Sequence, residues 1–364
     1  MKIAHVVSNF SGAVGDDAAS QPALELSIAS ARLGYAVTVV SLGAPSAGAL
    51  AAELRDANVI VQALGGRAGS QRGALIKLAW LFARARPDVV HTHQDALAMG
   101  WAASRMLSPL RGPRLVHTVA DGDALRRSSR VVQALLRTSV EGVAEAEGVA
   151  AEMEGVLGKR PQYVIPDGIR VAAFAMPDAD RASARAELGL RRNQVVFLTV
   201  FDREHDSGLI LDAFARPGMG PARLLIADAG ALRGPLEAQA RALDVLGRVD
   251  FLGDSAPLPR ILGAADALVV AAASPCSVVK QAMAAGLPVI AAQNAPWVSD
   301  ATGLGFSAGD AAALSAAMKR LAQDRMLGRR LGLAGATVAL EQFDARAVAQ
   351  RYEKVYAAAC GKTR

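Results

Sequence analysis

Aromatic residues and cysteines are scarce in this sequence. Phe, Trp and Tyr supply 4% of its 364 residues, whereas hydrophobic residues as a class supply 52%. We therefore expect an α/β protein whose core is built from Ala, Val and Leu, and the length allows two domains that each bury a core. The two cysteines, Cys276 and Cys360, lie far apart and match no metal-binding spacing. This favours a reduced, cytoplasmic setting and predicts no bound metal.

Long apolar runs are absent as well. No run reaches the roughly 18–20 residues that a membrane span needs. The start, MKIAHVVSNFSG, reads as a strand that leads into a glycine loop. It lacks the charged flank and the small-residue cleavage site of a signal peptide, so we expect a cytoplasmic protein.

The formal net charge is +6, and the basic residues concentrate only in residues 77–86 and 105–130. Aromatic and basic residues do not alternate as they do in proteins that stack nucleic-acid bases, so we expect no nucleic-acid partner. Three explanations of the charge stay open. They are weak attraction to an anionic membrane face, an acidic acceptor molecule, and a solvated arginine-rich surface.

Residues 264–293 read as one βαβ unit of a parallel sheet. An apolar run of strand length (266–273) gives way to a short helix (278–285), Gly286 ends the helix, and a second apolar run (289–292) follows. In parallel sheets, ligands bind beyond the carboxyl ends of the strands, against a helix N-terminus. The expected ligand-facing turn contains Ser274, Cys276, Ser277 and Val278. The alternative role of Cys276 is that of a small packing residue in the turn.

The start of the chain has the same pattern. A strand over 2–8 leads into a loop with Gly12 and Gly15, and a helix over 21–33 and a strand over 36–41 follow. The glycine spacing differs from the dinucleotide fingerprint G-x-G-x-x-G, which argues against a nicotinamide cofactor. Because both glycines follow the carboxyl end of a strand, we expect them to line a binding site.

Two further strand ends in this half carry polar side chains. Residues 86–93, RPDVVHTH, place His91 and His93 two positions apart, so both share one face of a strand. A second strand, 115–119, ends just before Asp121. We expect Asp121 and at least one histidine to line the same site. The alternative is a structural histidine that is bonded to the backbone.

Four motifs make the chain resemble family 4 of the glycosyltransferases, which have the two-domain GT-B fold. They are AMAAGLPVIA after position 281, RPDVVHTH at 86–93, YVIPDGI at 163–169 and RVDFLG at 248–253. The resemblance covers nearly the whole chain. It implies two Rossmann-like domains whose parallel sheets face each other across a cleft, and a C-terminal helix that crosses back. The implied parts are an acceptor-side domain (1–168), a donor-side domain (169–343) and the returning helix (344–364).

The donor site is where the chain departs from the family pattern. The family holds the diphosphate with a Gly, an Arg and a Lys, and the aligned residues here are Phe201, Asp202 and Ser207. Two acidic positions of the family are Ala273 and Gln281 in this chain. Each lost charge-assisted contact costs about 1.5–3 kcal/mol.

Neighbouring groups can replace the lost ones. We expect Arg203, and His205 after it, to serve as catalytic residues that stabilise the leaving diphosphate. Gln281 can hydrogen-bond a ribose through its amide group. The expected donor-binding set is Ser207, Gly208, Gly230, Ser274, Cys276, Ser277, Val278 and Gln281. The acceptor-binding set is Gly12, Gly15, His91, His93 and Asp121.

The resemblance implies a retaining, metal-independent and cofactor-free transfer of a sugar from a nucleotide sugar to a cell-envelope glycan or lipid-linked acceptor. Such a protein is cytoplasmic, with peripheral contact at the inner face of the membrane. The substitutions leave a second hypothesis open, an inactive GT-B pseudoenzyme that acts as a scaffold or regulatory partner of an active glycosyltransferase. A sugar-nucleotide epimerase on the same fold is a weaker third, because a fold does not determine a function.

Overall fold

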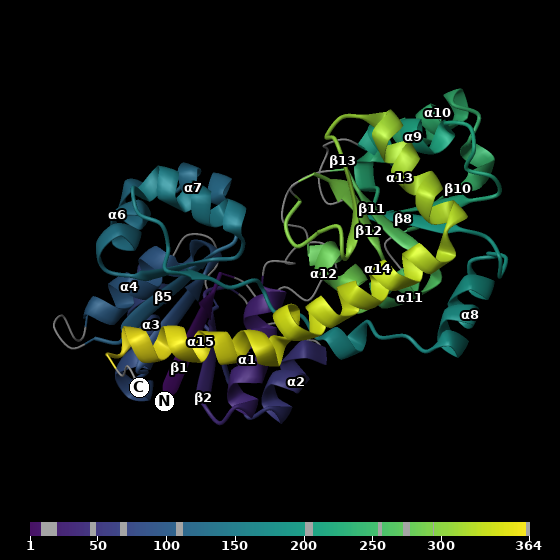
Figure 1. Cartoon of the computed structure of the whole chain (residues 1–364). Helices are drawn as coiled ribbons and strands as arrows, with labels where there is room; N and C mark the ends of the chain where they lie inside the picture. The colour runs from purple at the N-terminus through teal and green to yellow at the C-terminus, as the bar shows by residue number, and fades with distance from the viewer. Residues whose placement is uncertain are drawn as a thin grey trace. The chain divides into compact units, whose positions relative to one another are not determined.

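The computed structural model describes residues 1–8, 20–43, 49–65, 71–106, 112–200, 207–253, 257–271, 277–293 and 295–361. It forms two compact units (Figure 1). The first unit comprises Met1–Ile169 with Asp344–Arg364, and the second comprises Arg170–Phe343. Each unit has a parallel sheet flanked by helices, which confirms the α/β class expected from the sequence.

The sheet of the first unit has seven strands in the order β3-β2-β1-β4-β5-β6-β7, and the neighbouring strands run parallel. The strand order reverses between β1 and β4, and ligands of such sheets bind beyond the carboxyl ends of the strands at the reversal. The strands are β1 (Lys2–Val7), β2 (Ala36–Ser41), β3 (Ile60–Ala63), β4 (Val89–His93), β5 (Arg114–Val119), β6 (Glu141–Ala144) and β7 (Tyr163–Val164).

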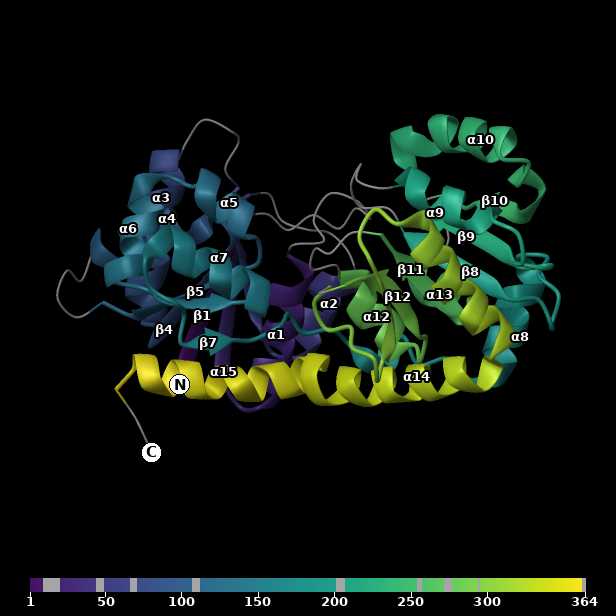
Figure 2. The same ribbon diagram turned by 45° about the horizontal axis from the view of Figure 1, so that its top comes forward.

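Helices cover both faces of this sheet. α1 (Gln21–Arg32), α2 (Ala49–Asp56) and α15 (Ala345–Ala359) bury their apolar sides on one face. α3 (Gln71–Ala85) and α4 (Leu97–Met106) pack on the other face. Figure 2 shows α15 and α1 below the sheet, with α3 and α4 above it. The remaining helices of the unit are α5 (Gly122–Arg127), α6 (Arg130–Thr138) and α7 (Glu147–Leu157).

The last helix therefore belongs to the first unit, although the chain reaches it from the second. Val348, Tyr352 and Tyr356 are buried against the strands of the first sheet. The start of α15 lies close to the segment around Ile169, because the amide of Ala345 donates to the carbonyl of Ile169 over 2.9 Å. A Cβ at Gly168 would lie 3.0 Å from the Cα of Ala345, so glycine suits this position.

The sheet of the second unit has six strands in the order β10-β9-β8-β11-β12-β13. The strands are β8 (Val196–Val200), β9 (Arg223–Ala227), β10 (Val249–Phe251), β11 (Ala267–Val270), β12 (Val289–Ala292) and β13 (Gly303–Phe306). The helices are α8 (Asp178–Glu187), α9 (Ser207–Ala215), α10 (Arg233–Ala242), α11 (Leu258–Ala264), α12 (Ser277–Ala284), α13 (Ala311–Gln323) and α14 (Arg325–Val338).

The βαβ unit expected over 264–293 is present as β11, α12 and β12. β11 and β12 pair in parallel, with Leu268 opposite Val289. Gly286 follows α12 with φ +73°, the left-handed conformation that ends a helix. A π-helical turn over Ala339–Phe343 precedes the final helix, and Phe343 is buried in the second unit. Among the described residues, no helix is long and apolar enough to cross a membrane.

Two glycines of α14 provide a test of the packing in the second unit. A Cβ at Gly332 would lie 2.0 Å from the carbonyl oxygen of Gly286, whereas one at Gly328 meets only the ring of Pro288 at 4.0 Å. We expect Gly332→Ala to lower the free energy of unfolding by about 1–3 kcal/mol. Gly328→Ala in the same helix should raise it by about 0.5–1 kcal/mol. Chemical denaturation of both variants measures the difference, and equal effects would contradict the close approach.

Candidate functional site

The carboxyl edge of the second sheet holds the predicted donor site. The strand order reverses between β8 and β11, which pair in parallel, so both strands end at this edge. α9 begins at Ser207 after β8, and α12 begins at Ser277 after β11. The first turn of a helix has unpaired backbone N–H groups that attract anions. Two helix N-termini thus follow the two strands that flank the reversal.

Several predicted donor residues lie outside the described residues, namely Arg203, His205, Ser274 and Cys276, together with Phe201, Asp202 and Ala273. Their roles stay predictions. The structure describes the others. Gly208 lies in the first turn of α9, and its carbonyl accepts from the side-chain amide of Gln239 over 3.1 Å. Gly230 is exposed with φ +47° after β9. Ser277 is exposed and Val278 is buried.

Gln281 is the most informative of the described donor residues. It lies four residues after Ser277, on the same side of α12. Its side-chain oxygen is buried and has no hydrogen-bond partner among the described residues. An unpaired buried acceptor costs about 1–3 kcal/mol, so such groups are uncommon in proteins unless a ligand or water satisfies them. The amide oxygen of Gln281 is therefore available to a hydroxyl donor.

Lys280, the neighbour of Gln281, has a different environment. Its side chain is 1% exposed, and its Nζ lies 4.7 Å from the ring centroid of Trp297. Trp297 has φ +68°, which is rare for a residue other than glycine, and its ring meets that of Phe343 edge-on. Lys280 therefore makes a cation–π contact within the second unit. The sequence pattern did not predict this pair, because residues 280 and 297 are brought together only by the fold.

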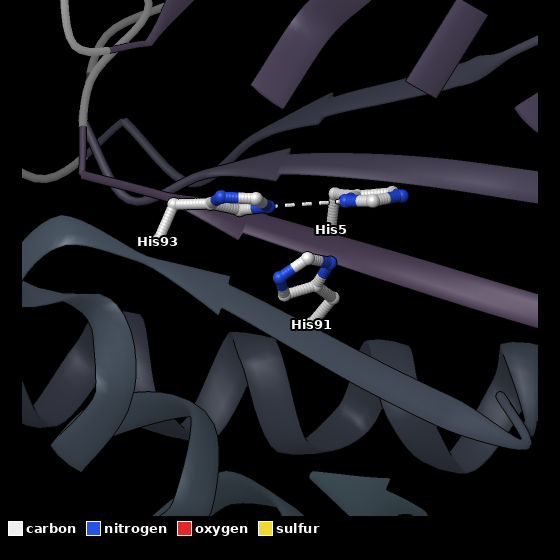
Figure 3. Close-up of side chains that lie close together, drawn as sticks. All are labelled: His5, His91 and His93. Atoms are coloured by element: carbon white, nitrogen blue, oxygen red, sulfur yellow. Dashed lines mark hydrogen bonds between the residues drawn. The ribbon is translucent and has the colours of Figure 1, made fainter. Parts of the chain in front are cut away.

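Three histidines meet on one face of the first sheet (Figure 3). His91 and His93 share a face of β4, as their spacing predicts, and His5 of β1 lies opposite His91 in the strand register. The Nδ1 of His5 lies 3.1 Å from the Nε2 of His93. His5 was missed in the sequence because no motif links it to residues 91–93. The alternation of side chains along two adjacent parallel strands could have indicated that His5 and His91 share a face.

His91 is a structural residue in this unit. Its Nδ1 is hydrogen-bonded to the hydroxyl of Tyr356 over 2.8 Å, and its Nε2 to the hydroxyl of Thr118 over 2.8 Å. Thr118 in turn is bonded to the hydroxyl of Tyr352 over 2.7 Å. Both ring nitrogens are thus occupied, and the side chain is fully buried. His91 ties α15 to the sheet and has no polar atom left for an acceptor.

The remaining acceptor-side residues occupy different places. His93 is the last residue of β4 and is 7% exposed. Asp121 caps α5, because its Oδ1 accepts from the amide of Asp123 over 2.8 Å. Gly12 and Gly15 lie outside the described residues. The structure leaves their acceptor roles as predictions, and it adds helix capping as a role of Asp121.

The three histidines are also the candidate metal ligands of the described chain. One nitrogen from each of His5, His91 and His93 lies within 4.8 Å of the others. Burial lowers the pKa of His5 to about 3 and holds the pKa values of His91 and His93 well below their usual range, so all three rings are neutral. A cation would have to break the His5–His93 hydrogen bond and one of the two bonds of His91. The contacts fit a hydrogen-bonded core better than a metal centre.

Two family models match the sequence. The model described as "Glycosyltransferase Family 4" matches residues 21–173, and the model described as "Glycosyl transferases group 1" matches residues 192–324. The chain belongs to the family 4 glycosyltransferases. A comparison with curated proteins finds no match.

Solved structures show that this glycosyltransferase chain has the GT-B fold. Alr3699/HepE of Anabaena, solved in complex with UDP and glucose, superposes with a TM-score of 0.79 at 19% identity, over 98% of this chain and 100% of that one. Sucrose-phosphate synthase of Thermosynechococcus elongatus gives 0.75 at 20% identity, over the whole of both chains. WaaG, a glycosyltransferase involved in lipopolysaccharide biosynthesis, gives 0.66 at 14% identity, over 97% and 99%. At these identities the likeness concerns the fold.

The buried histidines predict a steep loss of stability in acid. His117, on the other face of the sheet, has its pKa lowered by burial to about 4. In the unfolded chain each imidazole takes up a proton near pH 6.5, whereas His5, His91, His93 and His117 stay neutral in the folded state. Below that pH the unfolded state binds more protons. The free energy of unfolding should therefore fall by about 1.4 kcal/mol per pH unit for each histidine, until the folded pKa is reached.

Urea unfolding of the protein between about pH 7 and about pH 5 measures this dependence. His117→Gln removes one of the four groups and should make the slope shallower by about 1.4 kcal/mol per pH unit. A slope that does not change in this variant would contradict a neutral His117 in the folded protein.

Proposed function

We propose that the protein transfers a sugar from a nucleotide-sugar donor to a cell-envelope glycan or a lipid-linked acceptor. The observation that carries this proposal is the buried oxygen of Gln281, which has no hydrogen-bond partner among the described residues. It lies on a helix whose N-terminus follows a strand at the reversal of the second sheet. The family membership and two of the similar structures support it. Alr3699/HepE was solved with UDP-glucose, and WaaG takes part in lipopolysaccharide biosynthesis.

In the proposed donor complex, the charge of the diphosphate is balanced without a metal ion. The N–H groups in the first turns of α9 and α12 bind the phosphate oxygens. The oxygen of Gln281 accepts a hydrogen bond from a hydroxyl of the ribose. Arg203, with His205 nearby in the sequence, supplies the positive charge that the family takes from an Arg and a Lys. The transfer is proposed to retain the configuration of the sugar.

The proposed acceptor side is the carboxyl edge of the first sheet. His93 ends β4, Asp121 follows β5, and Gly12 and Gly15 follow β1 in the sequence. We leave His91 out of this set because both its ring nitrogens bond to protein hydroxyls. A lipid-linked acceptor would place the protein at the inner face of a membrane, in peripheral contact with it.

A second function stays open because of the donor-site substitutions. Ser207 and Gln281 are neutral where the family has a cation and an acid, and Asp202 is an acid where the family has a cation. A chain that lost donor binding would be a pseudoenzyme, acting as a scaffold or regulator of an active glycosyltransferase. Nucleotide binding distinguishes the two functions.

A panel of nucleoside diphosphates provides the first test. We expect at least one of them, at millimolar concentration, to raise the melting temperature, since a ligand that binds only the folded state stabilises it. Gln281→Leu, which removes the amide but keeps the size, should weaken that binding by about ten-fold. Gln323→Leu, at an exposed position of α13, is the matched control and should bind as the parent does. A panel without any shift would favour the pseudoenzyme.

The second test addresses the positive charge at the donor site. Arg203→Ala should lower the rate of sugar transfer or of donor hydrolysis by about ten- to a hundred-fold, the effect of one charge-assisted contact. If the parent protein binds no nucleotide, the triple variant Asp202→Arg, Ser207→Lys and Gln281→Glu should create binding. A triple variant that gains nothing would show that these residues are not aligned with the family's donor motif.

A further inference from the structure

The positive charge of the protein comes from one part of the chain. Residues 71–140 contain eleven Lys and Arg and four Asp and Glu, a net charge of +7, whereas the whole chain carries +6. The remainder of the chain is therefore nearly neutral. The segment 71–140 includes α3, α4, α5 and α6, and α3 packs against α4 on the sheet face opposite α15 (Figure 2).

α3 presents a stripe of basic and apolar side chains to solvent. Arg72, Ile76, Trp80 and Arg84 follow one another at intervals of four residues, and all four are exposed. Ile76 is 60% exposed and Trp80 is 63% exposed, while the guanidinium of Arg84 lies 5.8 Å from the Trp80 ring centroid. The opposite side of the helix is buried in the core of the first unit. No acidic residue occurs in α3.

Two further helices of this segment, α4 and α6, also combine basic residues with exposed apolar side chains. α4 and α6 also contain no acidic residue, and each exposes one apolar side chain, Met106 and Val131. Arg127 and Arg130 are exposed, and no ion pair engages either of them in the part of the chain that the structure describes. The α3 stripe (Arg72, Ile76, Trp80, Arg84) therefore lies in a segment whose charges are mostly positive, eleven basic against four acidic residues.

We propose that the α3 stripe binds an anionic lipid surface, with Ile76 and Trp80 entering the interface and the arginines pairing with lipid headgroups. Tryptophan and aliphatic residues flanked by Lys and Arg are the composition of helices that lie in a membrane interface. Juxtamembrane basic residues are attracted by the negative potential of anionic lipids. A second copy of this chain fits the stripe less well, because two strongly positive surfaces would repel each other. The proposal does not depend on sugar transfer.

α14 supplies a matched control in the same molecule. It exposes Met326 (71%) and Leu333 (72%) beside Arg329 and Arg330, so it resembles α3 in its exposed residue types. However, its unit, Arg170–Phe343, has 18 basic and 17 acidic residues and thus almost no net charge. Apolar exposure alone would make both helices bind. Because only α3 lies in a positively charged segment, we expect α3 and not α14 to bind anionic lipid.

Vesicle co-sedimentation of the full chain tests the proposal. The vesicles are phosphatidylcholine alone, or phosphatidylcholine with about 30% phosphatidylglycerol, at low salt and at about 0.5 M salt. The variants are Ile76→Ser with Trp80→Ser, Arg72→Glu with Arg84→Glu, and the control Met326→Ser with Leu333→Ser. Circular dichroism checks that each variant is folded, since all six side chains are exposed.

We expect the parent to bind the anionic vesicles at least ten-fold more tightly than the neutral ones, and high salt to weaken this binding. Either α3 variant should lower the partition coefficient by about ten-fold, and the α14 control should leave it unchanged. Equal binding to both vesicle types, loss of binding in the α14 variant, no effect of the α3 variants, or α3-dependent dimerisation without vesicle binding would each overturn the proposal.

Discussion

The burial of the last helix against the first sheet is the constraint on which the first unit depends. Tyr352 and Tyr356 are buried there. The hydroxyl of Tyr352 is hydrogen-bonded to Thr118, and that of Tyr356 to His91. Burial raises the pKa values of both phenols, so they remain neutral hydrogen-bonding groups. Because α15 follows the whole second unit in the sequence, this contact closes the first unit only after nearly the entire chain has been made. The π-helical turn over Ala339–Phe343 precedes the crossing.

The same interface explains why a histidine of a family motif is not a ligand-binding group here. His91 is placed in mid-sheet under a helix, while His93, two residues later, ends the strand. Removing imidazoles from water disfavours their charged form, so the network is neutral and its hydrogen bonds link hydroxyls and imidazoles. The Nδ1 of His5 bonds to His93, and its Nε2 is buried with no partner within the described ranges of the chain. If Nδ1 carries the proton of His5, Nε2 has an unshared lone pair and no N–H group that needs an acceptor.

The second unit has the βαβ scaffold that the sequence predicts, and the donor-site roles of its residues remain predictions. The scaffold is intact, as shown by the pairing of β11 with β12 and the glycine stop after α12. In the proposed donor site, Gln281 offers an amide oxygen where the family has a carboxylate. The ammonium group of Lys280 lies over the ring of Trp297, 4.7 Å from its centroid. The net positive charge of the chain comes from residues 71–140, which belong to the first unit.

Local patterns in the sequence were enough to determine the α/β class, the βαβ unit around Gly286 and the return of the last helix. Each of these follows from periodicity and glycine placement within about thirty residues, or from a family motif. The spacing of His91 and His93 likewise determined that they share a face. Only the tertiary structure decided that His5 joins them, that Tyr356 is bonded to His91, and that the buried oxygen of Gln281 has no partner in the part of the chain that is described. These contacts join segments up to 265 residues apart. Strand order and register set them, and no local pattern specifies which distant residue will lie opposite.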